Sequence, residues 1–183
     1  MWKAFARFMF FNVFRWKFSG KFDTTIPKYI VIVAPHTSNW DFIIGIFART
    51  SIGIGHAKYL GKSQLFKWPY GFIFRALGGH PVDRSKHNNL VEAVVAIFNS
   101  KEKFAVALAP EGTRKKVGKL KTGFYHIAEA AKIPIYLVGF DYPSKTVKIS
   151  EAYYPSGDID KDMPEIMKFF KNIVGKNPEL GLF

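Results

Sequence analysis

The chain contains no cysteine among its 183 residues. Without cysteine there is no disulfide, no thiolate-bound zinc and no cysteine nucleophile. A long apolar run is also missing: the longest candidate, Phe42 to Ala57, is interrupted by Arg49 and three glycines. It falls short of the roughly 20 residues that a membrane-spanning helix needs. No Gly-x-Ser-x-Gly sequence occurs either, so a serine hydrolase of the α/β type is not expected.

Acidic residues are scarce, with 14 Asp and Glu against 27 Lys and Arg. The net charge of +13 favours an anionic partner, such as nucleic acid, a membrane surface or a phosphorylated substrate. Hydrophobic residues make up 48% of the chain and aromatic residues 17%, which is enough for a folded core. At this length we expect a single domain.

The N-terminal residues 1–20 combine aromatic side chains with cations. Apolar residues recur at spacings of three and four along one side of the expected helix: Trp2, Phe5, Met9, Val13 and Trp16. Cations lie on the other side: Lys3, Arg7, Arg15 and Lys17. This pattern predicts an amphipathic helix lying on an anionic membrane surface. The alternative is a helix that packs on the domain, because four further phenylalanines make the basic side apolar too.

The remainder of the chain, residues 21–183, alternates between short apolar runs and helical patterns. We expect strands at residues 29–35, 56–60, 104–109, 133–140 and 146–150, and helices at 41–51, 86–98, 122–131 and 160–174. Such alternation predicts a single layered α/β domain with a mostly parallel central sheet flanked by helices. In these sheets, functional sites gather at the carboxyl ends of the strands.

Two polar clusters follow two of the expected strands. His36 leaves the strand at 29–35, and Asp41 follows five residues later at the expected start of a helix. A neutral imidazole can take a proton from a hydroxyl, and a nearby carboxylate can orient it. We therefore predict His36 as a general base and Asp41 as its partner. A lone histidine in a fold is often only structural, which is the alternative for this residue.

The second cluster, Glu111-Gly112-Thr113-Arg114, follows the strand at 104–109. Arg84 stands similarly after a glycine-containing segment. Arginine binds phosphate oxygens bidentately, and tight turns with exposed N–H groups favour anions. We expect these two arginines to contact substrate. Several lysines follow Arg114; by themselves they are typical of a solvated loop. The other histidines show no metal-ligand spacing, so no metal is expected.

Four sequence blocks occur in a fixed order. They are His36 to Asp41; Lys62, Leu65, Pro69 and Gly71 with Gly79 to Arg84; Glu111 to Arg114; and Ile133 to Ile135. Together they resemble the glycerolipid acyltransferase family, typified by the 1-acylglycerol-3-phosphate acyltransferases with their His-x4-Asp motif. The resemblance implies that residues 21–183 form an acyltransferase domain. It also implies substrate-binding roles for Lys62, Arg84, Glu111, Gly112, Thr113 and Arg114.

The resemblance implies transfer of a fatty acyl group from acyl-CoA or acyl-carrier protein to a lysolipid hydroxyl, with 1-acylglycerol-3-phosphate as the first candidate acceptor. It implies no cofactor beyond the acyl donor, no nucleic-acid partner, and a peripheral place on the cytoplasmic face of a membrane. One alternative is another lipid acceptor, such as a lyso-aminolipid, a lysophospholipid or a lipid A precursor. The other is a non-catalytic basic protein that binds membrane or nucleic acid.

Overall fold

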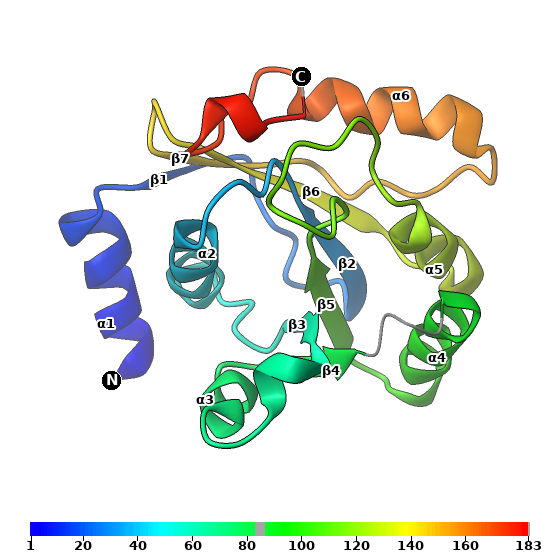
Figure 1. Cartoon of the computed structure of the whole chain (residues 1–183), viewed down its shortest axis with the longest axis horizontal. Coiled ribbons are helices and arrows are strands. Elements are labelled where there is room, and N and C mark those ends of the chain that lie inside the picture. Colours follow the sequence, from blue (N-terminus) through cyan, green and yellow to red (C-terminus); the bar gives the residue numbers. More distant parts are fainter. Residues whose placement is uncertain (83–86, 183) are drawn as a thin grey trace.

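A seven-stranded sheet forms the centre of the protein (Figure 1). The computed structural model describes residues 1–82 and 87–182. The strands are β1 (Lys17–Ser19), β2 (Lys28–Val33), β3 (Lys58–Lys62), β4 (Gly79–Val82), β5 (Phe104–Leu108), β6 (Ile135–Asp141) and β7 (Thr146–Ile149). Their order across the sheet is β1-β7-β6-β2-β5-β3-β4.

The sheet is mostly parallel. Strands β6, β2, β5, β3 and β4 run in one direction, and β7 pairs with β6 in the opposite direction. The short β1 then runs parallel to β7. Because the five parallel strands end at the same edge, the residues that follow them are brought together. The predicted α/β class and its mostly parallel sheet are confirmed.

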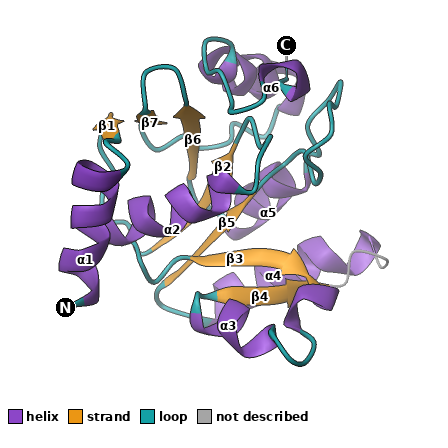
Figure 2. Ribbon diagram, turned by 60° about the vertical axis from the view of Figure 1, so that its left-hand side comes forward, coloured by secondary structure: helices purple, strands orange, loops and turns teal. Residues whose placement is uncertain are grey.

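Helices cover both faces of the sheet (Figure 2). The helical segments are α1 (Trp2–Phe8), a π-helical turn η1 (Met9–Val13), α2 (Trp40–Ser51), η2 (Ser63–Phe66), α3 (Gly71–Ala76), α4 (His87–Ser100), α5 (Gly123–Ala131), α6 (Ile159–Phe170) and η3 (Pro178–Leu180). Within residues 1–82 and 87–182, no helix combines the length and hydropathy required to cross a bilayer.

The central strand β2 shows why both faces need cover. Ile30 and Ile32 are fully buried toward α4, α5 and α6, whereas Tyr29 and Val31 are buried toward α2 and the N-terminal segment. A strand that is apolar on both sides is typical of a parallel sheet between two helical layers. Its continuous apolar run therefore fixes its place at the centre of the sheet.

The N-terminal segment is less helical than its pattern predicts. Helical structure ends at Val13, and Arg15 adopts a left-handed conformation (φ 56°) that a helix cannot continue. Lys17 then begins β1 by donating its N–H to the carbonyl of Lys145. Trp16, predicted on the exposed stripe, is instead buried, with its ring 5.0 Å from that of Tyr142. Pairing with β7 thus overrides the local periodicity.

The remaining predicted elements are present with small changes at their ends. β3 starts two residues later than expected, and α6 ends at Phe170 rather than near residue 174. β4 was not predicted as a strand: its four residues pair with β3, and no local pattern marks them. These differences leave the edge that carries the polar clusters unchanged.

Candidate active site

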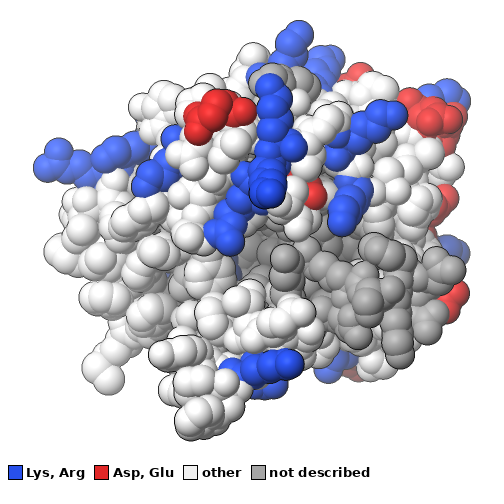
Figure 3. Space-filling model, viewed as in Figure 1, with Lys and Arg blue, Asp and Glu red and all other residues white. Residues whose placement is uncertain are grey.

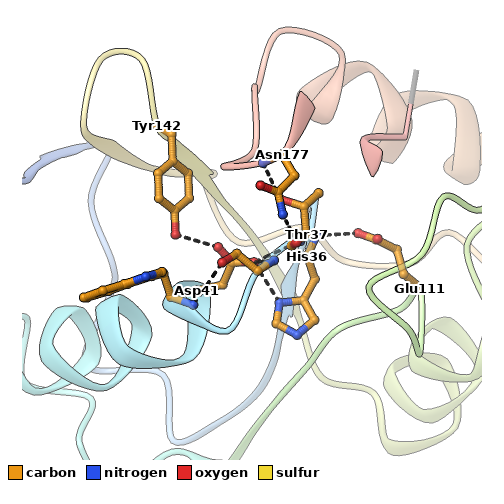
Figure 4. A network of polar contacts seen from close by, with 8 residues as sticks. His36, Thr37, Asp41, Glu111, Tyr142 and Asn177 are labelled. Carbon is orange, nitrogen blue, oxygen red and sulfur yellow. Dashed lines mark hydrogen bonds and ion pairs between the residues drawn. The ribbon is translucent and has the colours of Figure 1, made fainter. Parts of the chain in front are cut away.

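His36 and Asp41 lie in contact at the carboxyl end of β2. His36 is in the loop that leaves the strand, and Asp41 is in the first turn of α2. The Nδ1 atom of His36 is 3.0 Å from Oδ2 of Asp41, as Figure 4 shows. A carboxylate at Nδ1 favours the tautomer with its proton there, so Nε2 carries the free lone pair. The predicted proximity of the two side chains is present.

The two side chains differ in exposure. The imidazole of His36 is 25% exposed, whereas the carboxylate of Asp41 is 2% exposed. A solute can therefore reach the ring, while its acidic partner stays shielded from water. This is the arrangement that a general base and its orienting carboxylate require.

Asp41 is fixed by three further donors. The backbone N–H groups of Thr37 and Ser38 both donate to Oδ2 over 2.9 Å, and the hydroxyl of Tyr142 donates to Oδ1 over 2.7 Å. Burial raises the pKa of Tyr142, and its hydrogen bond to Asp41 and the charge of that carboxylate raise it further. Tyr142 consequently remains a protonated donor at neutral pH. The carboxylate is held in one orientation by groups from the loop between β2 and α2 and from the turn after β6.

The C-terminal segment fixes the same loop from the other side. Asn177 donates its side-chain amide to the carbonyl of Thr37 over 2.8 Å and its backbone N–H to the hydroxyl of Thr37 over 3.2 Å (Figure 4). Gly175 packs so closely on Thr37 that an added Cβ would lie 2.7 Å from its hydroxyl oxygen. Thr37 is therefore held in place by residues about 140 positions away in sequence.

Glu111 connects the two predicted clusters. Its Oε1 accepts a hydrogen bond from the backbone N–H of His36 over 2.7 Å, which joins the ends of β5 and β2. The side chain is 2% exposed, and burial raises its pKa, while the His36 N–H and imidazole act in the opposite direction. Within the described residues, its Oε2 is buried without a hydrogen-bond partner. Glu111 thus supports the main chain at His36.

The residues after Glu111 turn outward. Gly112 has a φ of +68°, a left-handed conformation that favours glycine, and the next two residues, Thr113 and Arg114, are exposed. Exposed lysines continue along this loop at positions 115, 116, 119 and 121. Figure 3 shows Lys and Arg gathered over the loop between β5 and α5. The loop therefore presents positive charge beside the edge that carries His36.

For two other residues that were predicted to bind substrate, Lys62 and Arg84, the structure describes only a backbone position or nothing. Lys62 is the last residue of β3, so its backbone lies at the same sheet edge as His36 and Glu111. Arg84 lies outside the described residues. For these two positions the role in substrate binding stays a prediction. Within residues 1–82 and 87–182, no three His, Asp or Glu side chains gather in a metal-binding group.

Sequence reasoning missed Tyr142 and Asn177. Tyr142 directly follows β6, a central parallel strand, so its place at the site edge offered a usable signal. Asn177 lies in an irregular segment after α6, and its local sequence carries no comparable signal. Both contribute to the site only through tertiary contacts.

The sequence of the chain assigns it to a known family. Residues 17–141 match the Acyltransferase family, and the chain belongs to it. Its sequence is 27% identical over 126 residues to a 1-acyl-sn-glycerol-3-phosphate acyltransferase from Salmonella typhimurium, covering 66% of this chain and 50% of the relative. It is 25% identical over 129 residues to the Escherichia coli protein of the same name, covering 67% of this chain and 51% of that one. The chain spans about half the length of these curated relatives.

A solved structure with a similar fold is that of the 1-acyl-sn-glycerophosphate (LPA) acyltransferase PlsC from Thermotoga maritima. The two structures agree with a TM-score of 0.60 at 20% sequence identity, covering 91% of this chain and 73% of the other. At that identity the likeness establishes the shared fold.

Proposed function

We propose that this protein is a membrane-surface acyltransferase that moves a fatty acyl group from an acyl thioester to the hydroxyl of 1-acylglycerol-3-phosphate. The observation that carries the proposal is the 3.0 Å contact between a reachable imidazole and a buried carboxylate. Membership of the Acyltransferase family supports it. Relatives named 1-acyl-sn-glycerol-3-phosphate acyltransferase support the choice of acceptor.

The proposed reaction uses His36 as a base and then as an acid. Nε2 takes the proton from the acceptor hydroxyl as its oxygen attacks the thioester carbonyl carbon. The carbon–sulfur bond then breaks, and the departing sulfur receives that proton from the imidazolium. Asp41 stabilises the imidazolium through Nδ1 and keeps the ring in position. No covalent acyl-enzyme and no metal is part of this scheme.

Acceptor recognition is assigned to the loop after β5. Arg114 would form charge-assisted hydrogen bonds to the acceptor phosphate, with Arg84 and Lys62 as further cations. The exposed lysines after Arg114 add positive potential near the same edge. Glu111, Gly112 and Thr113 would shape the turn from which Arg114 projects.

Membrane contact is assigned first to α1 and η1. This segment packs on the domain through Ala6 and Phe10, both fully buried. Aromatic side chains of the same segment remain about half exposed, with Trp2 52%, Phe5 49% and Phe8 56% accessible. The two sequence-based alternatives for this segment are therefore compatible, since the segment packs on the domain and still exposes aromatic side chains to lipid. We propose peripheral association with an anionic membrane surface.

The direct test is release of free thiol from an acyl thioester in the presence of a lysolipid. Acyl-CoA and acyl-carrier protein serve as alternative donors, and lysophosphatidate, other lysophospholipids and lyso-aminolipids serve as acceptors. Wild-type protein is expected to release thiol fastest with lysophosphatidate. His36→Ala should reduce turnover by about 10²–10⁴-fold, the usual contribution of general base catalysis.

The matched control is His126→Ala, which removes a half-exposed histidine of α5 that lies 3.9 Å from Glu129. It should keep wild-type turnover. Retention of more than about a tenth of the activity in His36→Ala would show that the base is assigned wrongly. Preference for a lyso-aminolipid would keep the chemistry and replace the acceptor.

A further inference from the structure

A second group of outward-facing aromatic residues lies on η2, α3 and their connection. Trp68 is 93% exposed, Phe72 70% and Tyr70 66%. Leu65 and Ile73, at 44% and 43%, extend the same area. We call these five residues the 65–73 surface. Side chains of this size are normally buried, so such a group indicates an interaction site.

The backbone beneath the 65–73 surface is anchored by inward-facing contacts. Phe66 is 4% exposed, and Arg75 donates to its carbonyl over 2.9 Å. Tyr59 donates its hydroxyl to the carbonyl of Phe74 over 3.0 Å. Gly79 lets the Phe66 ring approach closely, since an added Cβ would lie 2.6 Å from it. Phe66 and Phe74 fill the inner positions, and the exposed aromatics are consequently presented outward.

The 65–73 surface lies in a long stretch of sequence that has cations but no carboxylates. Residues 42–82 contain five Lys or Arg and no Asp or Glu, and residues 1–22 contain five and none as well. All 14 carboxylate side chains of the chain lie elsewhere. These two stretches carry α1 and the 65–73 surface. This combination of aromatic side chains and cations complements an anionic lipid surface.

The 65–73 surface and α1 lie around α2 on one side of the molecule. The ring of Phe47 in α2 is 6.1 Å from Trp2, and the ring of Phe42 in the same helix is 6.4 Å from Phe74. Ile43 of α2 is itself 38% exposed. In Figure 3 the left and lower left, where α1 and α3 lie in Figure 1, show no Asp or Glu. An apolar, carboxylate-free surface thus extends from α1 to α3.

We infer that the 65–73 surface is a second membrane-contact site, which places Trp, Tyr and Phe side chains in the interfacial layer of an anionic bilayer. Trp and Tyr favour this layer because their rings are apolar at one end and polar at the other. Lys67, which is exposed, supplies a cation for lipid phosphates.

The 65–73 surface lies next to the candidate active site. η2 begins at Ser63, directly after the end of β3, and so adjoins the sheet edge that carries His36. Contacts at both α1 and α3 would set this edge against the lipid headgroups. A lysolipid would then reach His36 while its acyl chain stays in the bilayer. This last step rests on the proposed function; the membrane contact itself does not.

The test compares W68S/F72S with the control Tyr154→Ser, using flotation with vesicles. Both variants remove exposed aromatics, but Tyr154, 60% exposed, follows β7 outside the 65–73 surface. The vesicles contain equal phosphatidylcholine and phosphatidylglycerol, with pure phosphatidylcholine as the second arm. W68S/F72S should bind the anionic vesicles at least about tenfold more weakly, because two large apolar side chains no longer insert. Tyr154→Ser should bind as the wild type does.

A second measurement places Trp68 directly. Brominated lipids quench tryptophan fluorescence at bilayer depth, and the chain has four tryptophans. Trp68→Phe retains an aromatic ring, so it should bind vesicles but lose a large part of the quenched signal. Unchanged quenching, or unchanged binding of a folded W68S/F72S protein, would overturn the inference. A shift from dimer to monomer in W68S/F72S without loss of vesicle binding would also overturn it, since it would assign the surface to a second copy.

These binding measurements contain no substrate. If vesicle binding behaves as expected but no thiol is released with any acceptor, the proposed function fails and the membrane-contact site remains. If thiol release is normal but W68S/F72S binds vesicles as the wild type does, only this inference fails.

Discussion

The end of β2 and the end of β5 are built differently, although both carry residues predicted from the same kind of sequence signal. At the end of β2, Asp41 is buried and accepts hydrogen bonds from Thr37, Ser38 and Tyr142. At the end of β5, Glu111 is buried, but Arg114 is exposed three residues later. One strand end is fixed by many partners, and the other projects its charge into solvent.

This difference suggests a division of labour. Proton transfer depends on geometry within a fraction of an ångström, which the hydrogen bonds around Asp41 supply before substrate arrives. Binding of a headgroup phosphate needs positive charge that can adapt to the ligand, which exposed arginine and lysine side chains supply. Under the proposed function, the chemistry would be determined at the end of β2 and the choice of acceptor at the end of β5. The predictions below test this division, beginning with the largest effect.

Asp41→Asn should give the largest loss, on the order of 10²–10⁴-fold in turnover. Both oxygens of the Asp41 carboxylate accept hydrogen bonds, whereas asparagine has only one acceptor oxygen. The NH2 group of asparagine would therefore face one of the present donors. If that amide faces Nδ1 of His36, the ring takes the opposite tautomer and Nε2 no longer accepts a proton. Thiol-release kinetics measure the effect.

A thermal unfolding scan of Asp41→Asn provides the control for this loss, because the carboxylate also stabilises the loop. A folded variant with less than a tenfold loss of turnover would contradict the role of Asp41. Retained turnover would mean that the hydrogen bonds to Asp41 stabilise the loop and do not contribute to catalysis.

Arg114→Lys should give a moderate loss that depends on the acceptor. Lysine keeps the charge but lacks the planar fork that binds phosphate bidentately. We expect kcat/KM for lysophosphatidate to fall at least about tenfold, roughly 1.4 kcal/mol, with kcat/KM for the acyl donor nearly unchanged. Lys116→Arg, a reverse change on the same exposed loop, is the matched control. Equal small losses on lysophosphatidate and on a lyso-aminolipid would remove phosphate recognition from Arg114.

Tyr142→Phe should give a smaller loss, about threefold in kcat, with little change in the KM of the acceptor. The change removes one of the donors to Asp41 and keeps the ring, which packs against Trp16. Tyr142 is proposed to position Asp41 and not to touch substrate. A rise in acceptor KM with unchanged kcat would therefore disprove the positioning role and point to direct contact.

The sequence was sufficient for the parts of the site that depend on local order. His36 and Asp41 are five residues apart across a strand–helix junction, and Glu111 follows the neighbouring strand, so the parallel sheet brings them together. Alternation of apolar runs and helical patterns was likewise sufficient for the central strands. Strong local patterns survive folding because the tertiary structure uses the same apolar faces that the sequence displays.

The remaining parts depend on contacts that no local pattern encodes. Tyr142 is 101 positions from Asp41, and Asn177 is 140 positions from Thr37. In the N-terminal segment, β1 pairs with β7 within residues 1–20, for which the sequence pattern predicted a helix. Phe10, one of the four phenylalanines on the basic side, is completely buried, which agrees with the alternative that this segment packs on the domain. Which side of an aromatic helix packs is determined by its neighbours.

Asp162 offers a second buried carboxylate for comparison with Asp41, because its hydrogen bonds are similar but it lies away from the site. Tyr125 donates to Oδ2 over 2.7 Å, and Ser156 donates its N–H to Oδ2 over 2.7 Å and its hydroxyl to Oδ1 over 2.9 Å. Burial alone would raise the pKa of Asp162, but the bonds from Ser156, Tyr153 and Tyr125 lower it to about 2. The folded-state pKa therefore lies below the ordinary value of 3.8.

Asp162→Asn should therefore lower the free energy of unfolding at neutral pH by about 2 kcal/mol without reducing the turnover of the folded protein. Since the pKa is lowered by folding, the stabilisation from this carboxylate is present above the unfolded value and is lost as the pH falls. Wild-type stability should decline between about pH 5 and pH 2 more steeply than that of the variant. Denaturant unfolding at a series of pH values measures this difference, and parallel curves would contradict it. A loss of turnover in folded Asp162→Asn would show that hydrogen-bonded buried carboxylates affect this enzyme wherever they lie, and the special role of Asp41 would then need other support.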